Sequence, residues 1–249
     1  MKLRFILTGL LLISSVFTVF AEPDFDQILI EIDKLGSFED TDFSCVYTFV
    51  SEKPGEETEV TQARMFRRDA SEQFVMLILK PEYQKGQGYL KVDENVWFYD
   101  PESRKFTHSS MKENVQNSEA KNSDMDGLSL AEDYEVDSWE LGKLGNFDTY
   151  ILSLKALNDE VTYPRLKVWV RTDATIVLKE EDYSLSDRLM RTTYFPKYVK
   201  VGMRYVPSQI LIVDNLQEGE KTQMTMKNPS TADLPDSVFS KAYIERVNN

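Results

Sequence analysis

The sequence predicts a mainly β protein in which one strongly curved antiparallel sheet wraps around a helix near the N-terminus. Apolar and polar residues alternate in about a dozen short runs, which is the pattern of half-buried strands. Turn residues separate these runs at hairpin-sized intervals, and helical spacing occurs in only one or two places. A doubly wound α/β fold is excluded, because it needs a helix between successive strands.

The expected helix lies close to the start of the chain. Asp24 is followed three residues later by Gln27, as at a capped helix start, and apolar residues recur at helical spacing up to Leu35. Gly36 is a residue type that commonly follows the last helical turn. One short helix covers only part of a long sheet whose inner positions are apolar. The uncovered part of that face is therefore a candidate cavity.

The strand-like runs fall into two groups. They lie at 43–52, 57–68, 73–80, 88–93 and 95–100, and then at 135–144, 147–156, 165–171, 175–184, 188–195, 205–214 and 220–227. Residues 109–133, between the groups, are mostly Ser, Asn, Asp, Glu and Lys with isolated apolar residues. A stretch of this length is a lid, a binding loop or a disordered segment, and we interpret it as a lid. A short tail at 235–247 closes the domain.

The first 21 residues have the pattern of a cleaved secretory signal. Lys2 and Arg4 precede an apolar run that extends to Phe20, and Ala21 supplies a small residue at the expected cleavage site. A retained membrane anchor is the alternative reading of this run. The only cysteine, Cys45, lies too far along the chain to carry a lipid next to that site. We therefore expect residues 22–249 to form a single domain outside the cytoplasm without a lipid anchor.

Composition excludes some classes of partner. The net charge of the whole sequence is −13, and the expected signal carries two basic residues and no acidic one, so the remainder is more negative still. This charge repels phosphate backbones, which makes nucleic acid an unsuitable partner. A single cysteine cannot form an internal disulfide, and Cys45 alternates with apolar residues, so we expect it in the core.

Six segments carry a family resemblance. They are Lys80-Pro81, Gly86–Leu90, Asn95–Arg104, Tyr163–Val170, Gly202–Pro207 and Leu234–Ser240. In order and spacing they resemble the outer-membrane lipoprotein-sorting family, the relatives of the lipoprotein carrier LolA, over most of the chain. The resemblance implies an incomplete, half-open β-barrel with an N-terminal helix and short lid helices over an apolar cavity. Residues 112–126 depart from the family's usual lid sequence, so lid opening or cargo preference is expected to differ.

The resemblance also implies the function and the partners. It predicts a periplasmic carrier that binds acyl chains of lipoproteins or phospholipids and delivers them toward the outer membrane. An inner-membrane transporter would load it, and an outer-membrane acceptor would receive the cargo. Such a carrier needs no catalytic group, cofactor or metal. Each buried methylene contributes about 0.8 kcal/mol, so a sixteen-carbon chain offers on the order of 10 kcal/mol without a polar anchor.

Two sets of residues are candidates for this binding site. The first set is apolar and is expected to line the cavity: Met65, Phe74, Met76, Ile78, Leu90, Trp97, Tyr99, Leu152 and Val168. The second set is a compact basic cluster that could meet a lipid headgroup at the rim: Arg64, Arg67 and Arg68. Ordinary core packing and ordinary strand-face charge remain the alternatives for both sets.

Two other functions compete with the carrier. His108, the only histidine, precedes Ser109 and Ser110, which suggests a lipid-active hydrolase, yet no Gly-x-Ser-x-Gly motif occurs and adjacent strand residues point to opposite faces. Residues 122–133 approximate a calcium loop, which suggests a calcium-dependent binding or adhesive module. The match is imperfect, because Asn122 and Asp133 replace the usual first Asp and last Glu. The sequence leaves the identity of the cargo and the oligomeric state open.

Overall fold

The computed structural model describes residues 23–93 and 95–248. The predicted signal at residues 1–21 lies outside these ranges. Among the described helices, none combines the length and the apolar character that a membrane crossing requires.

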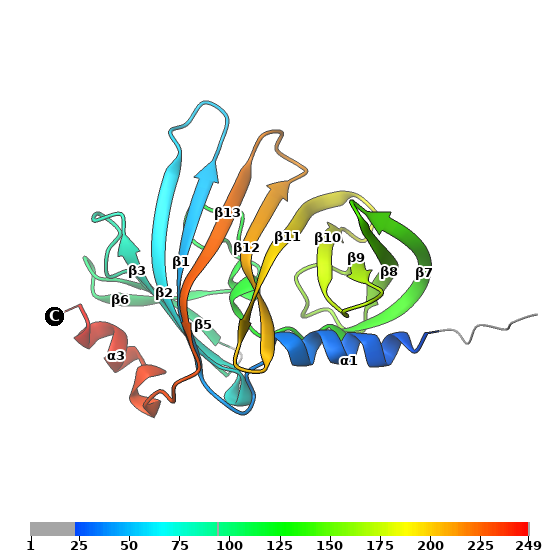
Figure 1. Cartoon of the computed structure of the whole chain (residues 1–249). Coiled ribbons are helices and arrows are strands. Elements are labelled where there is room, and N and C mark those ends of the chain that lie inside the picture. The colour runs from blue at the N-terminus through cyan, green and yellow to red at the C-terminus, as the bar shows by residue number, and fades with distance from the viewer. Residues whose placement is uncertain (1–22, 94, 249) are drawn as a thin grey trace, which may run out of the picture.

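The described residues form one thirteen-stranded antiparallel sheet (Figure 1). The strands are β1 (Phe43–Glu52), β2 (Glu59–Arg68), β3 (Gln73–Lys80), β4 (Gly88–Val92), β5 (Asn95–Asp100), β6 (Lys105–Ser109), β7 (Tyr134–Leu144), β8 (Phe147–Ala156), β9 (Arg165–Arg171), β10 (Val177–Tyr183), β11 (Leu189–Val201), β12 (Arg204–Asp214) and β13 (Lys221–Ser230). Their order across the sheet is β6-β5-β4-β3-β2-β1-β13-β12-β11-β10-β9-β8-β7.

This strand order explains the shape of the molecule. The chain runs outward from β1 to the edge strand β6, crosses to the opposite edge strand β7, and returns by hairpins until β13 pairs with β1. Within the described residues the two edge strands do not pair with each other, so the curved sheet stays open. The predicted mainly β, half-open barrel is confirmed. The connection from β6 to β7 has to pass across the open side, and we call residues 110–133 the cover segment.

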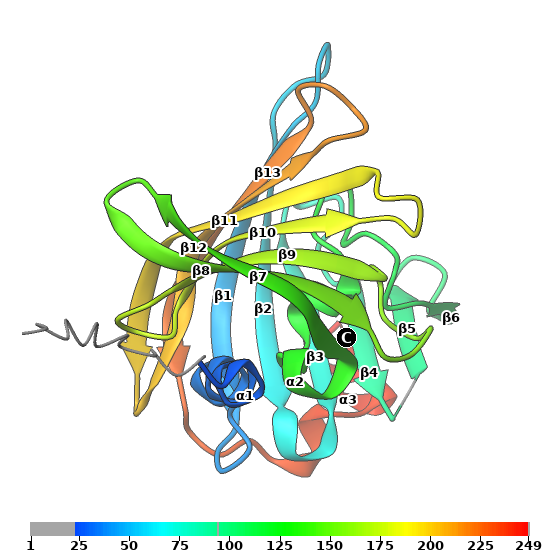
Figure 2. The same ribbon diagram turned by 90° about the vertical axis from the view of Figure 1, so that its right-hand side faces the viewer.

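Helices cover both faces of the sheet. The helix α1 (Phe25–Gly36) begins at Asp24, whose carboxylate accepts a hydrogen bond of 3.0 Å from the Gln27 amide, as the sequence predicts. It lies inside the arch of the sheet beside the short helix α2 (Leu130–Asp133) (Figure 2). The C-terminal helix α3 (Lys241–Arg246) packs on the outer face (Figure 1). We call the face toward α1 concave and the face toward α3 convex.

The predicted strands agree with the observed ones except at two places. The strand β6 is missing from the prediction, because its sequence is largely polar and only Ser109 is buried. The strand β11 continues past the predicted end at residue 195 to Val201, through Pro196 and a register shift between Tyr194 and Lys197. Proline is uncommon inside strands, so the sequence suggests an end where the chain only bulges. Cys45 is buried as expected, and burial raises the pKa of its thiol to about 12.

Candidate ligand-binding interior

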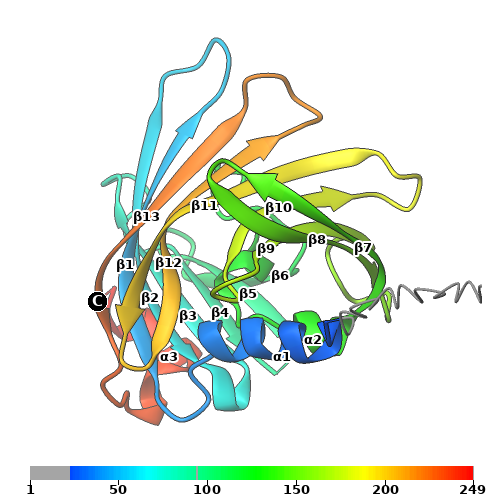
Figure 3. The same ribbon diagram turned by 45° about the vertical axis from the view of Figure 1, so that its right-hand side comes forward.

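The concave face carries two apolar clusters. The larger one spans β1–β4 and β11–β13 and includes Phe49, Met65, Phe74, Met76, Ile78, Met224 and Met226. The second joins α1 and α2 to β8 and β9, with Phe25, Leu29, Leu130, Leu152, Leu154, Val168 and Val170 at its centre. Figure 3 shows the helices lying along the open side of the arch that carries these clusters. Apolar clusters thus line the concave face from β4 across the sheet to β8.

Six of the nine predicted cavity residues lie on this face. Met65, Phe74, Met76 and Ile78 belong to the larger cluster, and Leu152 and Val168 belong to the second.

The other three predicted cavity residues, Leu90, Trp97 and Tyr99, lie on the convex face with α3. The expectation that Trp97 and Tyr99 share a face with Met76 and Ile78 is wrong. The register decides this: Leu90 lies opposite Val75 and Trp97, whereas Met76 lies opposite Tyr89. The strands β4 and β5 are apolar on both faces, so alternation alone could not choose between them.

The cover segment fills part of the concave face. Val115, Ala120 and Met125 are almost completely buried in the larger cluster, and Leu130 is buried in the second. The segment makes a short two-stranded bridge between Asn114 and Lys121 but does not join the sheet as a strand. Its apolar side chains therefore occupy the interior without the backbone pairing that holds the strands together.

Charged residues of the concave face hold the cover segment to the sheet at Asp126. Arg67 donates hydrogen bonds to the carbonyl oxygens of Asp126 (3.0 Å) and Gly36 (2.8 Å), and it forms an ion pair with Asp69. Lys91, itself buried on β4, binds the Asp126 carboxylate at 2.5 Å. One aspartate of the cover segment thus meets two cations on β2 and β4.

A second group of charges binds the cover segment from the other half of the sheet. Arg191 on β11 donates two hydrogen bonds to Asp124, at 2.6 and 3.0 Å, and one to the buried Asp182 at 2.5 Å. Glu180 lies two residues from Asp182 on β10. Burial, followed by the charge of Asp182, raises the pKa of Glu180 well above its ordinary value. The concave side therefore holds a second polar cluster besides the one around Asp126, and this cluster ties the cover segment to β10 and β11.

Of the sheet side chains that hold the cover segment, Arg67 was among the predicted site residues. The prediction missed Lys91, Arg191 and Asp182. Lys91 is a single charge within the apolar strand β4, and that is the only local signal that could have marked it. Arg191 and Asp182 lie in strands rich in polar residues, where nothing in the local pattern distinguishes them.

The three arginines predicted at the rim do not act together. Arg67 points to the concave face and holds the cover segment, as described above. Arg68 binds both carboxylate oxygens of Asp42, at 2.7 and 2.9 Å, and the carbonyl of Leu234, so it ties the C-terminal segment to the sheet. Arg64 is exposed on β2 and is the one member of the set that faces solvent. Successive side chains of a strand point to opposite faces, which separates Arg67 from Arg64 and Arg68.

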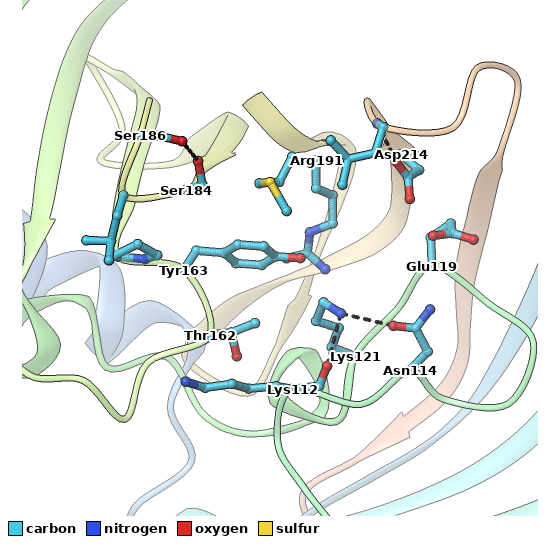
Figure 4. A pocket seen from close by; sticks show the side chains of 14 residues that line it. Lys112, Asn114, Glu119, Lys121, Thr162, Tyr163, Ser184, Ser186, Arg191 and Asp214 are labelled. Atoms are coloured by element: carbon cyan, nitrogen blue, oxygen red, sulfur yellow. Dashed lines mark hydrogen bonds between the residues drawn. The ribbon is translucent and has the colours of Figure 1, made fainter. Parts of the chain in front are cut away.

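A pocket of ≈ 630 Å³ opens beside the cover segment (Figure 4). Its walls come from the cover segment, the β8–β9 loop, the β10–β11 turn and the β12–β13 turn. Tyr163 and Arg191 point toward each other in this pocket, with the guanidinium 5.0 Å from the ring centroid. The ammonium group of Lys121 binds Asn114 and the carbonyl of Lys112, each at 3.0 Å.

The residues behind the alternative functions have other partners. His108 is exposed on β6 and packs edge-on against Trp97 at 5.5 Å, while Ser109 points the other way, is buried and binds Glu113. Asn122, proposed as the first calcium ligand, is buried and binds Ser109 and Ser110. The carboxylates of Asp124 and Asp126 bind Arg191 and Lys91, and that of Asp133 binds Ser129 and Asn158. Within residues 23–93 and 95–248, no three His, Cys, Asp or Glu side chains are grouped to hold a metal ion.

Solved structures share this architecture. A LolA superfamily protein from Nitrosomonas europaea is 22% identical, with 87% of this chain and 97% of that chain covered and a TM-score of 0.76. A domain from Vibrio parahaemolyticus described as an outer membrane lipoprotein-sorting protein is 16% identical, with 89% and 98% covered and a TM-score of 0.79. A DUF1329 family protein from Desulfovibrio piger is 19% identical, with 88% and 97% covered and a TM-score of 0.77.

These likenesses define the fold class: the protein is an open β-barrel of the LolA type. The fold implied by the resemblance of the six sequence segments is thereby confirmed. A family model described as "Uncharacterized protein" matches residues 70–246, and the chain belongs to that family. No curated protein matches the sequence.

Proposed function

We propose that this protein is a carrier that binds acyl chains of lipoproteins or phospholipids between its concave face and the cover segment. The observation that supports this best is the apolar interior itself, which is closed by a segment outside the sheet pairing. The LolA-type fold supports the same function. With the predicted signal at residues 1–21, the protein would work in the periplasm, between an inner-membrane transporter and an outer-membrane acceptor.

Binding would exchange one set of apolar contacts for another. The buried side chains of Val115 and Met125 contribute about 1.5–3 kcal/mol each to holding the cover segment in place. A sixteen-carbon chain offers on the order of 10 kcal/mol, which exceeds their sum and leaves a surplus to loosen the polar ties. An acyl chain therefore shifts the cover segment from the closed to the open state, and the segment returns when the chain leaves. No bond is made or broken, so the carrier needs no catalytic residue.

The tryptophans provide a test that reports the location of the ligand. Trp139 on β7 lies at the edge of the concave face, 4.8 Å from the ring of Phe25, whereas Trp97 lies on the convex face. Two variants of residues 22–249 each keep a single tryptophan: Trp97→Phe/Trp169→Phe keeps Trp139, and Trp139→Phe/Trp169→Phe keeps Trp97. A fatty acid brominated along its chain should quench the fluorescence of the first variant and leave the second unchanged.

Native mass spectrometry of the wild-type protein, purified from a secreted preparation, complements this experiment. Co-purified acyl lipid would identify the cargo as a lipoprotein chain or a phospholipid. Equal quenching of both tryptophan variants would place the ligand elsewhere, and absence of both quenching and uptake would reject the carrier.

A further inference from the structure

The wall of the sheet is split between β12 and β13. These strands pair from Val213 and Lys221 as far as Gln209 and Thr225, and no further. Beyond that point, residues 204–207 of β12 pair only with β11. In β13, Met226, Lys227 and Ser230 pair only with β1. Figure 1 shows the two strands diverging toward the end of the sheet near α1. In the described part of the chain, no strand fills the space between them.

The sequence explains why the pairing stops there. Pro207 and Pro229 lack the amide hydrogen that a sheet ladder needs, and each lies in one of the diverging segments. Asn228, which directly precedes Pro229 in β13, has a left-handed backbone with φ of 51°. Arg204, at the start of β12, binds the carbonyl of Ser37 and the carboxylate of Asp40. The start of β12 is therefore held toward the segment after α1, away from β13.

The split forms a cleft of ≈ 410 Å³, within the size range of small-ligand pockets. Two of its lining residues, Val199 and Met226, also pack in the larger apolar cluster of the concave face. Lys197 and Lys227 line the same cleft and are exposed to solvent. The cleft therefore leads from a basic outer end to the apolar interior.

The charge of the cleft is opposite to that of the protein. The whole sequence has a net charge of −13, yet no Asp or Glu lines the cleft. Neither Lys197 nor Lys227 forms an ion pair with any described residue. The two prolines also make these strand edges poor partners for an added strand, which disfavours an extended peptide as the occupant. A ligand with an acidic headgroup and an alkyl chain fits this cleft, because the headgroup can meet the two lysines and the chain can contact the apolar residues.

We propose that this cleft binds anionic single-chain amphiphiles, with the acidic headgroup between Lys197 and Lys227 and the alkyl chain directed past Met226 toward the interior. The proposal rests on the proposed function, because it gives the acyl-binding interior a second entrance through the wall of the sheet. It also adds a preference for negative headgroups. A fatty acid carboxylate and a lysophospholipid phosphate share this chemistry.

The test compares three ligands and three proteins by calorimetry below the critical micelle concentration. The ligands are palmitate, palmitoyl-lysophosphatidylglycerol and the zwitterionic palmitoyl-lysophosphatidylcholine. The proteins are the wild type, the variant Lys197→Glu/Lys227→Glu, and the control Lys105→Glu/Lys200→Glu, which changes the total charge equally at two exposed lysines outside the cleft. We expect the cleft variant to bind the anionic ligands at least about tenfold more weakly and the zwitterion as well as the wild type does.

The outcomes separate the two proposals. A loss confined to palmitate, or to the phosphate ligand, supports the cleft and identifies the headgroup that it takes. Equal losses in the cleft variant and the control, an equal loss for the zwitterion, or no loss at all would overturn the cleft while the acyl-binding interior stands. A wild-type protein that binds none of the three ligands would overturn both.

Discussion

Arg191 holds Asp124 of the cover segment with two hydrogen bonds, of 2.6 and 3.0 Å, and at the same time binds Asp182 on β10 at 2.5 Å. The guanidinium is buried, so these are charge-assisted bonds in a setting where solvent screens them little. Asp182 is the permanent partner, because both residues belong to neighbouring strands. In the proposed opening of the cover segment, Asp124 is the partner that separates from Arg191.

Replacing Asp124 with Asn should loosen the cover segment without unfolding the sheet. The variant loses the charge that pairs with Arg191, which corresponds to about 1–2 kcal/mol and to about tenfold faster local opening. Hydrogen–deuterium exchange should therefore speed up in residues 110–126 and stay unchanged in β1 and β2. The control Asp187→Asn removes an exposed ion pair with Arg165 and should leave exchange in the cover segment unaltered. Unchanged hydrogen–deuterium exchange in the Asp124 variant would show that the Arg191–Asp124 contact does not hold the cover segment closed.

Glu180 and Glu181 are neighbours on β10 whose pKa values shift in opposite directions. Burial and the charge of Asp182 raise the pKa of Glu180. Burial also acts to raise the pKa of Glu181, but the hydrogen bonds from Lys179 and Tyr183 outweigh it, so the pKa of Glu181 is lowered. A carboxyl with a raised pKa contributes stability at low pH that is lost as the pH rises through its folded-state pKa. A carboxyl with a lowered pKa contributes stability at higher pH that is lost as the pH falls.

The variant Glu180→Gln should consequently be more stable than the wild type at pH 7 to 8, and the difference should shrink toward pH 4. The protonated form of Glu180 also supplies a donor to the Oδ1 atom of Asp182, which is buried and has no hydrogen-bond partner among the described side chains. An amide at position 180 keeps such a donor at every pH. The variant Glu181→Gln should show the opposite sign at neutral pH. Urea unfolding between pH 4 and pH 8 measures the free energy of unfolding of both variants. If both variants were more stable, or both less stable, than the wild type at neutral pH, the opposite pKa shifts of Glu180 and Glu181 would be refuted.

Asp42 joins three parts of the chain that are far apart in sequence. Its carboxylate binds Arg68 of β2 and accepts a hydrogen bond of 2.6 Å from the amide of Leu234. The hydrogen bonds from Arg68, opposed by burial, lower the pKa of Asp42. Because the side chain is largely buried, Asp42→Asn should lower the free energy of unfolding by about 3 kcal/mol at pH 7.

The pH dependence distinguishes this ion pair from a simple packing defect. A lowered pKa means that Asp42 stabilises the fold above its unfolded-state pKa and that the contribution is lost as the pH falls below it. The difference between wild type and Asp42→Asn should therefore be largest at neutral pH and should narrow in acid. Asp148→Asn, which breaks an exposed pair with Lys143, should cost less than about 0.5 kcal/mol. If the difference in free energy of unfolding between the wild type and Asp42→Asn stayed constant down to pH 3, the charge of Asp42 would not be the cause of the stabilisation.

The sequence could predict the elements because their signals are local. Asp24, Gln27 and Gly36 mark the ends of α1 within a few residues, and alternation locates twelve of the strands. The sequence also contained a signal for the packing of the cover segment against the sheet. Val115 and Met125 are isolated apolar residues in a polar stretch, and both are buried.

Two features could not be predicted from local signals: the ion pairs that hold the cover segment to the sheet, and the faces to which the side chains of β4 and β5 point. Arg191 meets Asp124 across 67 positions, and Lys91 meets Asp126 across 35, so only the strand order brings each pair together. The register that turns Leu90 away from Met76 depends on where the β3–β4 hairpin closes. Neither piece of information is present in the spacing of residue types.

Met76 and Leu90 offer a matched pair that tests which face holds the ligand. Both side chains are buried, with 0% and 2% of their surface exposed, but Met76 lies on the concave face and Leu90 on the convex face. Truncation to alanine should lower the stability of either variant by about 2–4 kcal/mol, because each leaves a cavity in a packed cluster. Equal destabilisation makes each variant the control for the other.

The two variants should differ in acyl binding. Met76→Ala enlarges the interior that the chain would occupy, so its affinity and its preferred chain length should change relative to the wild type. Leu90→Ala opens space only between the sheet and α3, so its affinity should stay within about twofold of the wild type once both proteins are folded. Displacement of a fluorescent fatty acid by chains of increasing length measures this difference. If Leu90→Ala changed the chain-length preference and Met76→Ala did not, the ligand would lie under α3 and the concave face would be an ordinary core.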